Sequence, residues 1–332
     1  METGNAIELK GVTKRFGDVI ANDNVNLTVR KGEILSILGE NGSGKTTLMN
    51  MLSGIYFPDE GEVYVDGKEV TIRFPKDSFA LGIGMIHQHF KLINILTAAE
   101  NIILGLPGKE KLNMKQVEKE IRELTEQYGF DLNPSQKIYD MSVSQKQTVE
   151  IVKVLYRGAD ILILDKPTAV LTPQETEKLF AVLRNMRKAG KSIIIITHKL
   201  NEVLELSDRV AVLRKGKYID TVETAKATEE SLTEMMVGEK VKLDINRTEP
   251  VGAEKRIEMR GITCRNKEGL KVLTEASFTA YSGEILGVAG ISGSGQKELL
   301  ESVAGLQPIE SGEILYFSPE GTTEKISEMK AE

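Results

Sequence analysis

Three short apolar runs in the first half and middle of the chain are continuous rather than alternating. They are ILSIL at 34–38, ILILD at 161–165 and SIIIIT at 192–197. A strand with apolar, often β-branched side chains on both faces is typical of the interior of a parallel sheet. The pattern therefore predicts a parallel sheet whose two faces are both covered by other elements.

Two longer stretches have the spacing of helices instead. Residues 172–190 carry the start and stop signals of a helix, namely an N-cap, a first-turn proline, a capping-box glutamate and a closing glycine: Thr172, Pro173, Glu175 and Gly190. The charged stretch 109–128 carries an apolar stripe made of Leu112, Val117, Ile121 and Leu124. These elements predict an α/β unit with a helical insert at about 112–128.

A degraded internal repeat divides the chain. GEILSILGENGSGKTTLMNMLSG, from Gly32, recurs as GEILGVAGISGSGQKELLESVAG from Gly283, and IELKGVTKRF at Ile7 resembles IEMRGITCRN at Ile257. Charge density rises between the two copies, which is typical of a linker. We therefore predict a complete first domain at 1–240, a linker at 241–255 and an incomplete second domain at 256–332.

Composition narrows the class of partner. The chain has 43 basic and 49 acidic residues, a net charge of −6, which argues against nucleic acid or an anionic bilayer as the main electrostatic partner. A lone cysteine, Cys264, excludes an intramolecular disulfide framework and suits a reducing compartment. The apolar runs are far shorter than the ~20 residues that span a bilayer. We expect a cytosolic globular protein that reaches a membrane only through a partner.

The segment GENGSGKTT fits the phosphate-loop pattern GxxxxGK[ST] and lies between an apolar strand and a helical stretch. In that context backbone N–H groups cradle phosphates, Lys45 reaches the β- and γ-phosphates, and Thr46 binds Mg²⁺. A second strand delivers the carboxylate of Asp165 as a further magnesium ligand. The predicted nucleotide-binding residues of this loop are Gly39, Asn41, Gly42, Ser43, Gly44, Lys45, Thr46 and Thr47.

Further polar and aromatic residues are candidates for the same site. Gln88 follows a strand-like GIGMI and is suited to orienting a water or Mg²⁺ at the γ-phosphate, while His198 ends SIIIITH near the same phosphate. Phe16 is placed to stack on adenine, although an isolated phenylalanine is more often part of a core. The segment DMSVSQKQTVEI, from Asp140, precedes a predicted helix whose N-terminus is suited to a phosphate.

The order of Phe16, GENGSGKTT, Gln88, MSVSQ, ILILD and His198 resembles the ATP-binding subunit of an ABC transporter. The phrases MIHQHF, AENIILG, YRGADILILD and PTAVLTPQE are similar to the two-headed, single-chain ATPases of bacterial importers for simple sugars and nucleosides. The resemblance implies a P-loop NTPase fold with a parallel sheet core, an N-terminal antiparallel β layer and a helical subdomain.

The same resemblance implies cofactors, partners and a location. ATP and Mg²⁺ would be bound, and two units would clamp two ATP molecules head to tail, each between a phosphate loop and the opposite signature motif. In this chain the signature residues would be Ser142, Ser144 and Gln145. The partners would be transmembrane permease subunits, facing the segment after Gln88, and through them a solute-binding protein. The subunit would lie on the inner face of the cell membrane.

The sequence departs from the family pattern at several positions. Lys166 stands where a glutamate would polarise the attacking water, and losing a general base typically costs ~10² to 10⁴ in rate. Ser144 replaces the signature glycine, and the second Gly-rich loop has Gln296 and Lys297 in place of lysine and the Mg²⁺-binding hydroxyl. The second unit also contains no signature of its own, as if truncated early.

These departures predict ATP binding with inefficient hydrolysis. The composite ATP site would be completed by homodimerisation or by pairing with another ABC ATPase. The cation at Lys166 is alternatively a drifted residue without a role, or a group that contacts the γ-phosphate. Two other functions stay open. One is a non-hydrolysing ATP-binding sensor or partner subunit, and the other is a remnant of a transport ATPase with exposed apolar surface near Ile285 and Val288.

Overall fold

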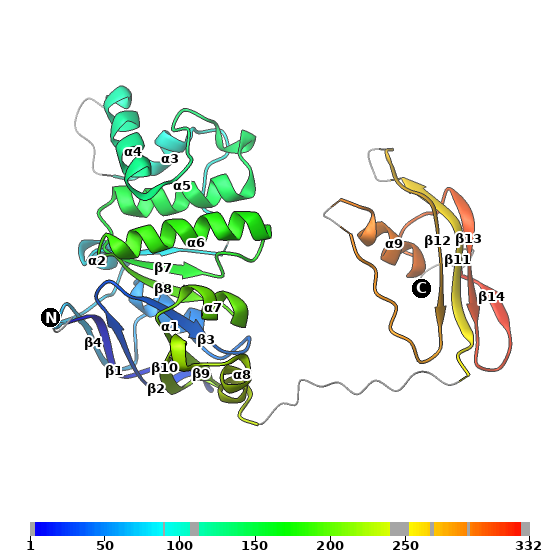
Figure 1. The fold of residues 1–332 in the computed structure, drawn as a ribbon, viewed down its shortest axis with the longest axis horizontal. Helices are drawn as coiled ribbons and strands as arrows, with labels where there is room; N and C mark the ends of the chain where they lie inside the picture. The colour runs from blue at the N-terminus through cyan, green and yellow to red at the C-terminus, as the bar shows by residue number, and fades with distance from the viewer. Residues whose placement is uncertain are drawn as a thin grey trace. The chain divides into compact units, whose positions relative to one another are not determined.

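The computed structural model describes residues 4–88, 90–106, 113–239, 252–265, 269–290 and 293–326. The chain divides into two compact units, Met1–Lys242 and Leu243–Glu332, each of which is described by itself (Figure 1). Most of the predicted linker, residues 241–251, lies outside the described residues. The first strand of the second unit already begins at Lys255, inside the predicted linker range.

A six-stranded sheet of order β10-β9-β3-β8-β7-β6 forms the centre of the first unit. Its inner pairs are parallel, and only β10 runs antiparallel to its neighbour β9. The strands are β3 (Ile34–Leu38), β6 (Ile83–Ile86), β7 (Ile161–Asp165), β8 (Ser192–Ile196), β9 (Arg209–Arg214) and β10 (Lys217–Glu223). The three strands predicted from continuous apolar runs are confirmed.

Alternate side chains of these strands enter two different hydrophobic clusters. In β8, Ile194 and Ile196 pack into the cluster on one face, while Ile193 and Ile195 pack into the cluster on the other. All five residues of β8 are buried, because elements cover both faces of the sheet. This double burial is the physical reason why the strand carries no polar side chain after Ser192.

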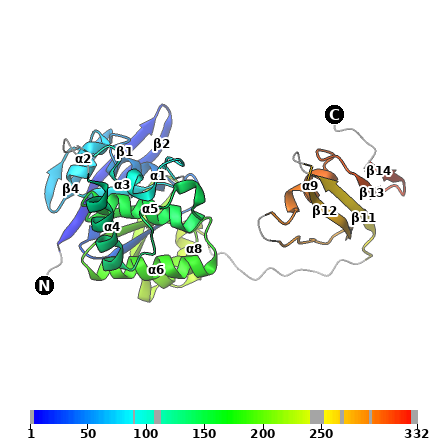
Figure 2. The same ribbon diagram turned by 90° about the horizontal axis from the view of Figure 1, so that it is seen from above.

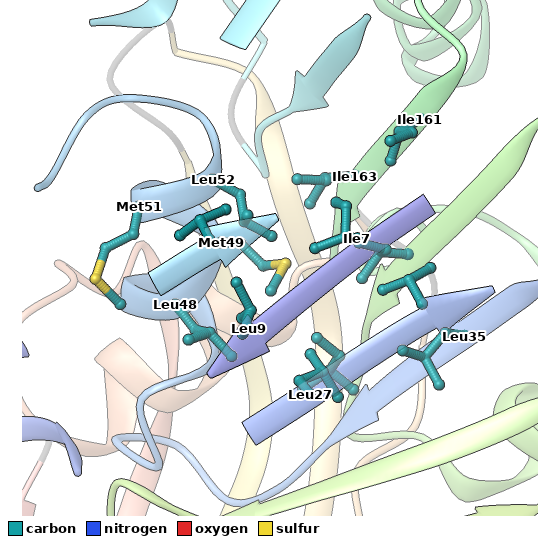
Figure 3. Packing of buried hydrophobic residues seen from close by; sticks show 14 of the residues in the cluster. Ile7, Leu9, Leu27, Leu35, Leu48, Met49, Met51, Leu52, Ile161 and Ile163 are labelled. Atoms are coloured by element: carbon teal, nitrogen blue, oxygen red, sulfur yellow. The ribbon is translucent and has the colours of Figure 1, made fainter. Parts of the chain in front are cut away.

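An antiparallel sheet and one helix cover the first face. The sheet has the order β2-β1-β4-β5. Residues Ile7 and Leu27 from that sheet meet Leu48 and Met49 from the helix and Ile163 from the central sheet (Figure 3). The elements are β1 (Asn5–Phe16), β2 (Val19–Arg30), β4 (Glu60–Val65), β5 (Lys68–Val70) and α1 (Lys45–Leu52). The predicted N-terminal antiparallel layer is confirmed.

Helix α6 (Pro173–Lys188) covers the opposite face, so it and the antiparallel sheet lie on different sides of the central sheet (Figure 2). Its N-cap is Thr172, with Glu175 completing the capping box, as the sequence predicts. The remaining helices of this unit are α2 (Pro75–Ala80), α3 (Ala98–Ile103), α4 (Met114–Tyr128), α5 (Val143–Tyr156), α7 (Leu200–Leu206) and α8 (Glu229–Val237). No helix in the described ranges is both long and apolar enough to cross a bilayer.

Helices α3, α4 and α5 form the predicted helical subdomain around a separate cluster that includes Ile102, Ile121 and Val149. The helix predicted over 109–128 begins at Met114, and residues 109–112 of that prediction lie outside the described residues. Asn113 caps it by accepting a hydrogen bond from the Gln116 N–H at 3.3 Å, and Gly129 ends it in a left-handed conformation.

The second unit repeats only the first part of this architecture. Its antiparallel sheet has the order β12-β11-β13-β14, which matches β2-β1-β4-β5 of the first unit, and one helix packs on it. Residues 284–290, the counterpart of the β3 region, form no strand, and Ile285 is 84% exposed. The elements are β11 (Lys255–Arg265), β12 (Lys271–Tyr281), α9 (Gln296–Val303), β13 (Ser311–Phe317) and β14 (Thr323–Lys325). The described part of the second unit therefore repeats the antiparallel sheet and the first helix of the first unit, and the predicted incompleteness of this domain stays a prediction.

Candidate nucleotide site

Four neighbouring parallel strands of the first unit end at one edge of the central sheet. The pairs Ile37–Ile196, Asp165–Ile196 and Ile86–Leu164 are in register, so the segments that follow β3, β8, β7 and β6 emerge side by side. Those segments contain the Gly-rich loop, His198, Lys166 and Gln88 respectively. In open α/β sheets, ligands bind at the carboxyl ends of the strands. The topology therefore gathers at one edge most of the residues that the sequence singles out.

The Gly-rich loop between β3 and α1 depends on glycine for close packing. A Cβ atom on Gly39 would collide with the carbonyl oxygen of Leu213, and one on Gly44 would collide with that of Ala21. Gly44 is also the N-cap of α1 with a φ of 91°, in the left-handed region that favours glycine. Within the described part of the chain no side chain caps this helix, so its first N–H groups are left for an anion.

Lys45 is buried within this loop. Its ammonium group donates to the carbonyl oxygens of Gly39 and Glu40, both at 2.7 Å, and to the Ser43 hydroxyl at 3.1 Å. Burial, followed by repulsion from Lys166, lowers the pKa of Lys45 to about 8. The loop thus holds a desolvated cation at its centre, where a phosphate seated on the loop would meet it.

Thr46 and Asp165 form a pair of oxygen ligands beside that cation. The Thr46 hydroxyl donates to Asp165 Oδ2 at 3.3 Å, and Asp165 Oδ1 is buried without a hydrogen-bond partner among the described residues. Burial raises the pKa of the Asp165 carboxyl, opposed by the Thr46 hydrogen bond and the nearby cations.

The donor set fits Mg²⁺, which prefers oxygen ligands and is usually completed by substrate phosphates and water. No group of three or more His, Cys, Asp or Glu side chains in the described residues is arranged to hold a metal by itself. A magnesium ion here would therefore be held by Thr46, Asp165 and the oxygens of a bound phosphate chain.

Lys166 follows Asp165 directly and takes a left-handed backbone conformation, with a φ of 48°. Its N–H donates to the carbonyl oxygen of Ile196 at 2.8 Å, and its ammonium group donates to Asn41 Oδ1 at 3.3 Å. The side chain thus reaches across to the phosphate loop, and the position carries a cation where a hydrolytic base would need a carboxylate or a neutral acceptor.

The other predicted contacts lie on exposed surface. Gln88 is exposed and lines a cavity of about 70 Å³ together with Asp165 and Lys166. His198 is exposed between β8 and α7. Phe16 is 43% exposed and packs edge-on against Tyr56, with ring centroids 5.1 Å apart, so its ring is accessible for stacking. The contacts of these three residues with nucleotide stay predictions.

The signature residues lie elsewhere, at the start of α5. Ser142 is the N-cap and shares a capping box with Gln145. The helix therefore starts at Val143 and contains Ser144, although the sequence pattern predicts Ser144 before the helix. The Ser142 and Ser144 hydroxyls are 3.0 Å apart, and a hydrogen bond from Ser144 is the main reason why the pKa of Glu175 is lowered. Among the described residues, the side chains of these serines bond to α5 and α6 residues and not to the phosphate loop.

Comparison with known proteins gives a consistent result. The family model described as ABC transporter matches residues 22–169. A bacterial ABC transporter cassette solved as a dimer is 30% identical, with a TM-score of 0.57, and the match covers 66% of this chain and 98% of that one. The chain belongs to the ABC transporter family.

Curated members of the ABC family are also similar over nearly all of this chain. The nucleoside import ATP-binding protein NupA of Lactococcus lactis is 46% identical over 98% of this chain. The guanosine import ATP-binding protein NupO of Bacillus subtilis is 45% identical over 93%. The chain spans 65% and 61% of the length of these two relatives.

The second Gly-rich loop of this ABC chain differs in chemistry from the first. Gln296, at the position of Lys45, donates through its side-chain amide to the carbonyl oxygen of Val288 at 2.9 Å. Lys297 is 3.7 Å from Glu301 on the same helix and is largely exposed. A neutral amide thus stands where the first loop has its buried ammonium group.

Two buried polar residues that were not predicted from the sequence hold the backbone next to the candidate site. Asn22 Nδ2 donates to the carbonyl oxygen of Gly44 at 3.2 Å, and Gln147 Nε2 donates to that of Pro167 at 2.7 Å. Gln147 lies four residues before the buried Ile151, on the same face of α5. A polar residue within this apolar stripe is the feature of the sequence that could have predicted a buried hydrogen bond. Asn22 had no comparable signal, because its neighbours in β2 alternate irregularly.

Proposed function

We propose that the chain is an ATP-binding subunit that energises import of a simple sugar or nucleoside through a membrane permease. The observation that carries this is the phosphate loop, with Lys45 buried at its centre and the Thr46–Asp165 pair beside it. ATP and Mg²⁺ are the proposed cofactors, since the loop fits phosphates and the oxygen pair fits the metal. The names of the curated relatives, which concern nucleoside and guanosine import, support the class of solute.

The proposed partners are the permease subunits and, through them, a solute-binding protein. The segment between β6 and α3, which follows Gln88, supports this, because it exposes Ile93 at 41% and Ile95 at 73%. Exposed apolar side chains on a loop are suited to a protein interface. In this arrangement the subunit lies on the cytoplasmic face of the membrane without inserting into it.

Two cassettes are required in this proposal. Ser142 and Ser144 of one unit do not meet the phosphate loop of the same unit, so a second copy, or another ABC ATPase, would have to supply the facing signature. Lys166 cannot accept a proton from water while it is charged, and Ser144 adds a side chain where the family has glycine. We therefore propose slow hydrolysis, reduced by ~10² to 10⁴ relative to a cassette with a base.

A non-hydrolysing ATP-binding subunit that pairs with an intact ATPase is the second candidate, and Lys166 is the observation that favours it. Phosphate release from Mg·ATP by wild type, K166E and K166Q distinguishes a slowly hydrolysing subunit from a non-hydrolysing one. Nucleotide affinity is measured on the same samples. Glutamate should raise turnover by ~10² or more, and K166Q should stay at least about tenfold below K166E because an amide is no base.

Either of two outcomes would contradict the slow-hydrolysis proposal. Wild-type turnover equal to that of K166E would mean that another group supplies the base. Equal turnover in K166E and K166Q would mean that the cation, and not the missing carboxylate, limits the rate. Absence of turnover in all three proteins, with ATP binding intact, would favour the non-hydrolysing subunit.

A further inference from the structure

The ammonium group of Lys166 is directed to the phosphate loop although its own strand, β7, is separated from the loop strand β3 by β8. It donates to Asn41 Oδ1 at 3.3 Å, a contact between residues 125 positions apart in the sequence. Asn41 is exposed and Lys166 is half-buried, so the cation lies on the accessible side of the loop. Lys45, by contrast, is 5% exposed and lies within the loop.

The backbone fixes the point from which this side chain starts. The φ of Lys166 is 48°, a conformation that L-residues rarely adopt, and the hydrogen bond of 2.8 Å from its N–H to the Ile196 carbonyl ties it to β8. The Cα atom from which the Lys166 side chain extends therefore has a fixed place beside the end of β8.

The order of groups along the sheet edge indicates which phosphate Lys166 would meet. In the proposed function, the loop N–H groups and Lys45 bind the phosphates that lie on the loop. Thr46 and Asp165 are the metal ligands, and they lie beside the outer phosphates of the chain. Lys166 comes immediately after Asp165 and approaches the loop from its accessible side. A third phosphate, projecting from the loop past the metal ligands, would lie between the Lys45 and Lys166 cations.

We propose that Lys166 is a phosphate-binding residue that selects nucleoside triphosphate over diphosphate by pairing with the terminal phosphate. The inference rests on the proposed function, in that ATP must occupy the phosphate loop. A substitution of glutamate by lysine changes the local charge by two units, so a position that would repel the terminal phosphate instead attracts it. The residue thereby favours the triphosphate-bound state of the subunit, independently of whether hydrolysis follows.

The test is calorimetric titration of the full chain with Mg·AMP-PNP, a triphosphate analogue that is not hydrolysed, and with Mg·ADP. The proteins are wild type, K166M, K166R and, as a matched control, K188M, which removes a lysine from the last turn of α6. K166M should bind AMP-PNP ~10-fold more weakly and ADP within about twofold of wild type, as expected for one partly exposed charge-assisted contact. K166R should retain the preference for triphosphate, and K188M should not alter it.

The inference is overturned if K166M leaves AMP-PNP affinity unchanged, or if it weakens AMP-PNP and ADP by the same factor. The second result would mean that Lys166 acts through the general electrostatic field of the site. In both cases the wild type still binds nucleotide, so the proposed function survives. If the wild type binds neither nucleotide, the phosphate-loop assignment fails and the inference fails with it.

Discussion

Replacing Lys45 with methionine should stabilise the nucleotide-free protein while removing its nucleotide binding. The side chain is 5% exposed, and its pKa falls from 10.5 to about 8, mainly because burial disfavours the charged form. One pKa unit corresponds to ~1.4 kcal/mol, so the buried charge costs roughly 3 kcal/mol at neutral pH. Methionine keeps the length and the apolar stem without the charge.

Part of that gain is offset in the variant. The carbonyl oxygens of Gly39 and Glu40 lose their donor, which costs about 1 kcal/mol. We therefore expect K45M to be more stable than wild type by about 2 kcal/mol at pH 7 in the absence of nucleotide and metal. Sites built for a ligand are commonly less stable than they could be, and under the proposed function this cation would be an instance of that trade-off.

The pH dependence distinguishes this cause from altered packing. Below pH 8, Lys45 is protonated in both the folded and the unfolded chain, so the full cost of burial is present. Between pH 8 and about 10.5 the folded protein releases the proton while the unfolded chain still holds it, so wild-type stability rises relative to K45M. The difference between the two proteins should therefore shrink over this interval and approach zero or reverse slightly at its upper end.

Urea denaturation followed by far-ultraviolet circular dichroism measures this, because the chain has no tryptophan to report by fluorescence. The proteins are compared in EDTA from pH 7 to 10, with K188M as the control for losing an exposed lysine. A second arm adds Mg·AMP-PNP at 100 times its Kd, which should stabilise wild type by about 2.7 kcal/mol and leave K45M unchanged. A variant less stable than wild type at pH 7, or a difference that does not vary with pH, would refute the reasoning.

The remaining predictions concern the scaffold of the site. Gly44→Ala should cost more than ~2 kcal/mol in the free energy of unfolding, because the new Cβ meets the Ala21 carbonyl oxygen. Gly42→Ala should cost only about 1 kcal/mol of backbone strain, because no atom of the described residues lies within 4 Å of its new Cβ. Equal losses for the two variants in urea titrations would contradict this. Arg209→Met should cost about 3 kcal/mol at neutral pH by leaving Glu33, whose pKa burial already raises, without its partner at 3.2 Å. A recovery at acidic pH, where Glu33 is protonated, should accompany that loss, and a pH-independent loss would indicate packing instead.

Local chemistry determined much of the fold directly from the sequence. The four consecutive isoleucines of SIIIIT favour a strand that is buried on both faces. The capping box of Thr172 and Glu175 fixes the start of α6 through hydrogen bonds within four residues. The Gly-rich loop was visible as a motif, and Gly44 supplies the left-handed conformation that the start of α1 requires. The repeat was also visible, since each copy carries the same glycine spacing.

Contacts between distant segments were decided only by the tertiary structure. No sequence rule places β8 between β3 and β7, and that order is what brings Lys166 to Asn41 and Asp165 to Thr46. The lowered pKa of Lys45 likewise depends on burial and on a cation 121 positions away in the sequence, at Lys166. Electrostatic and hydrogen-bond energies depend on separation in space, so the sequence named the charged groups of this site but the packing of the sheet set how they act on one another.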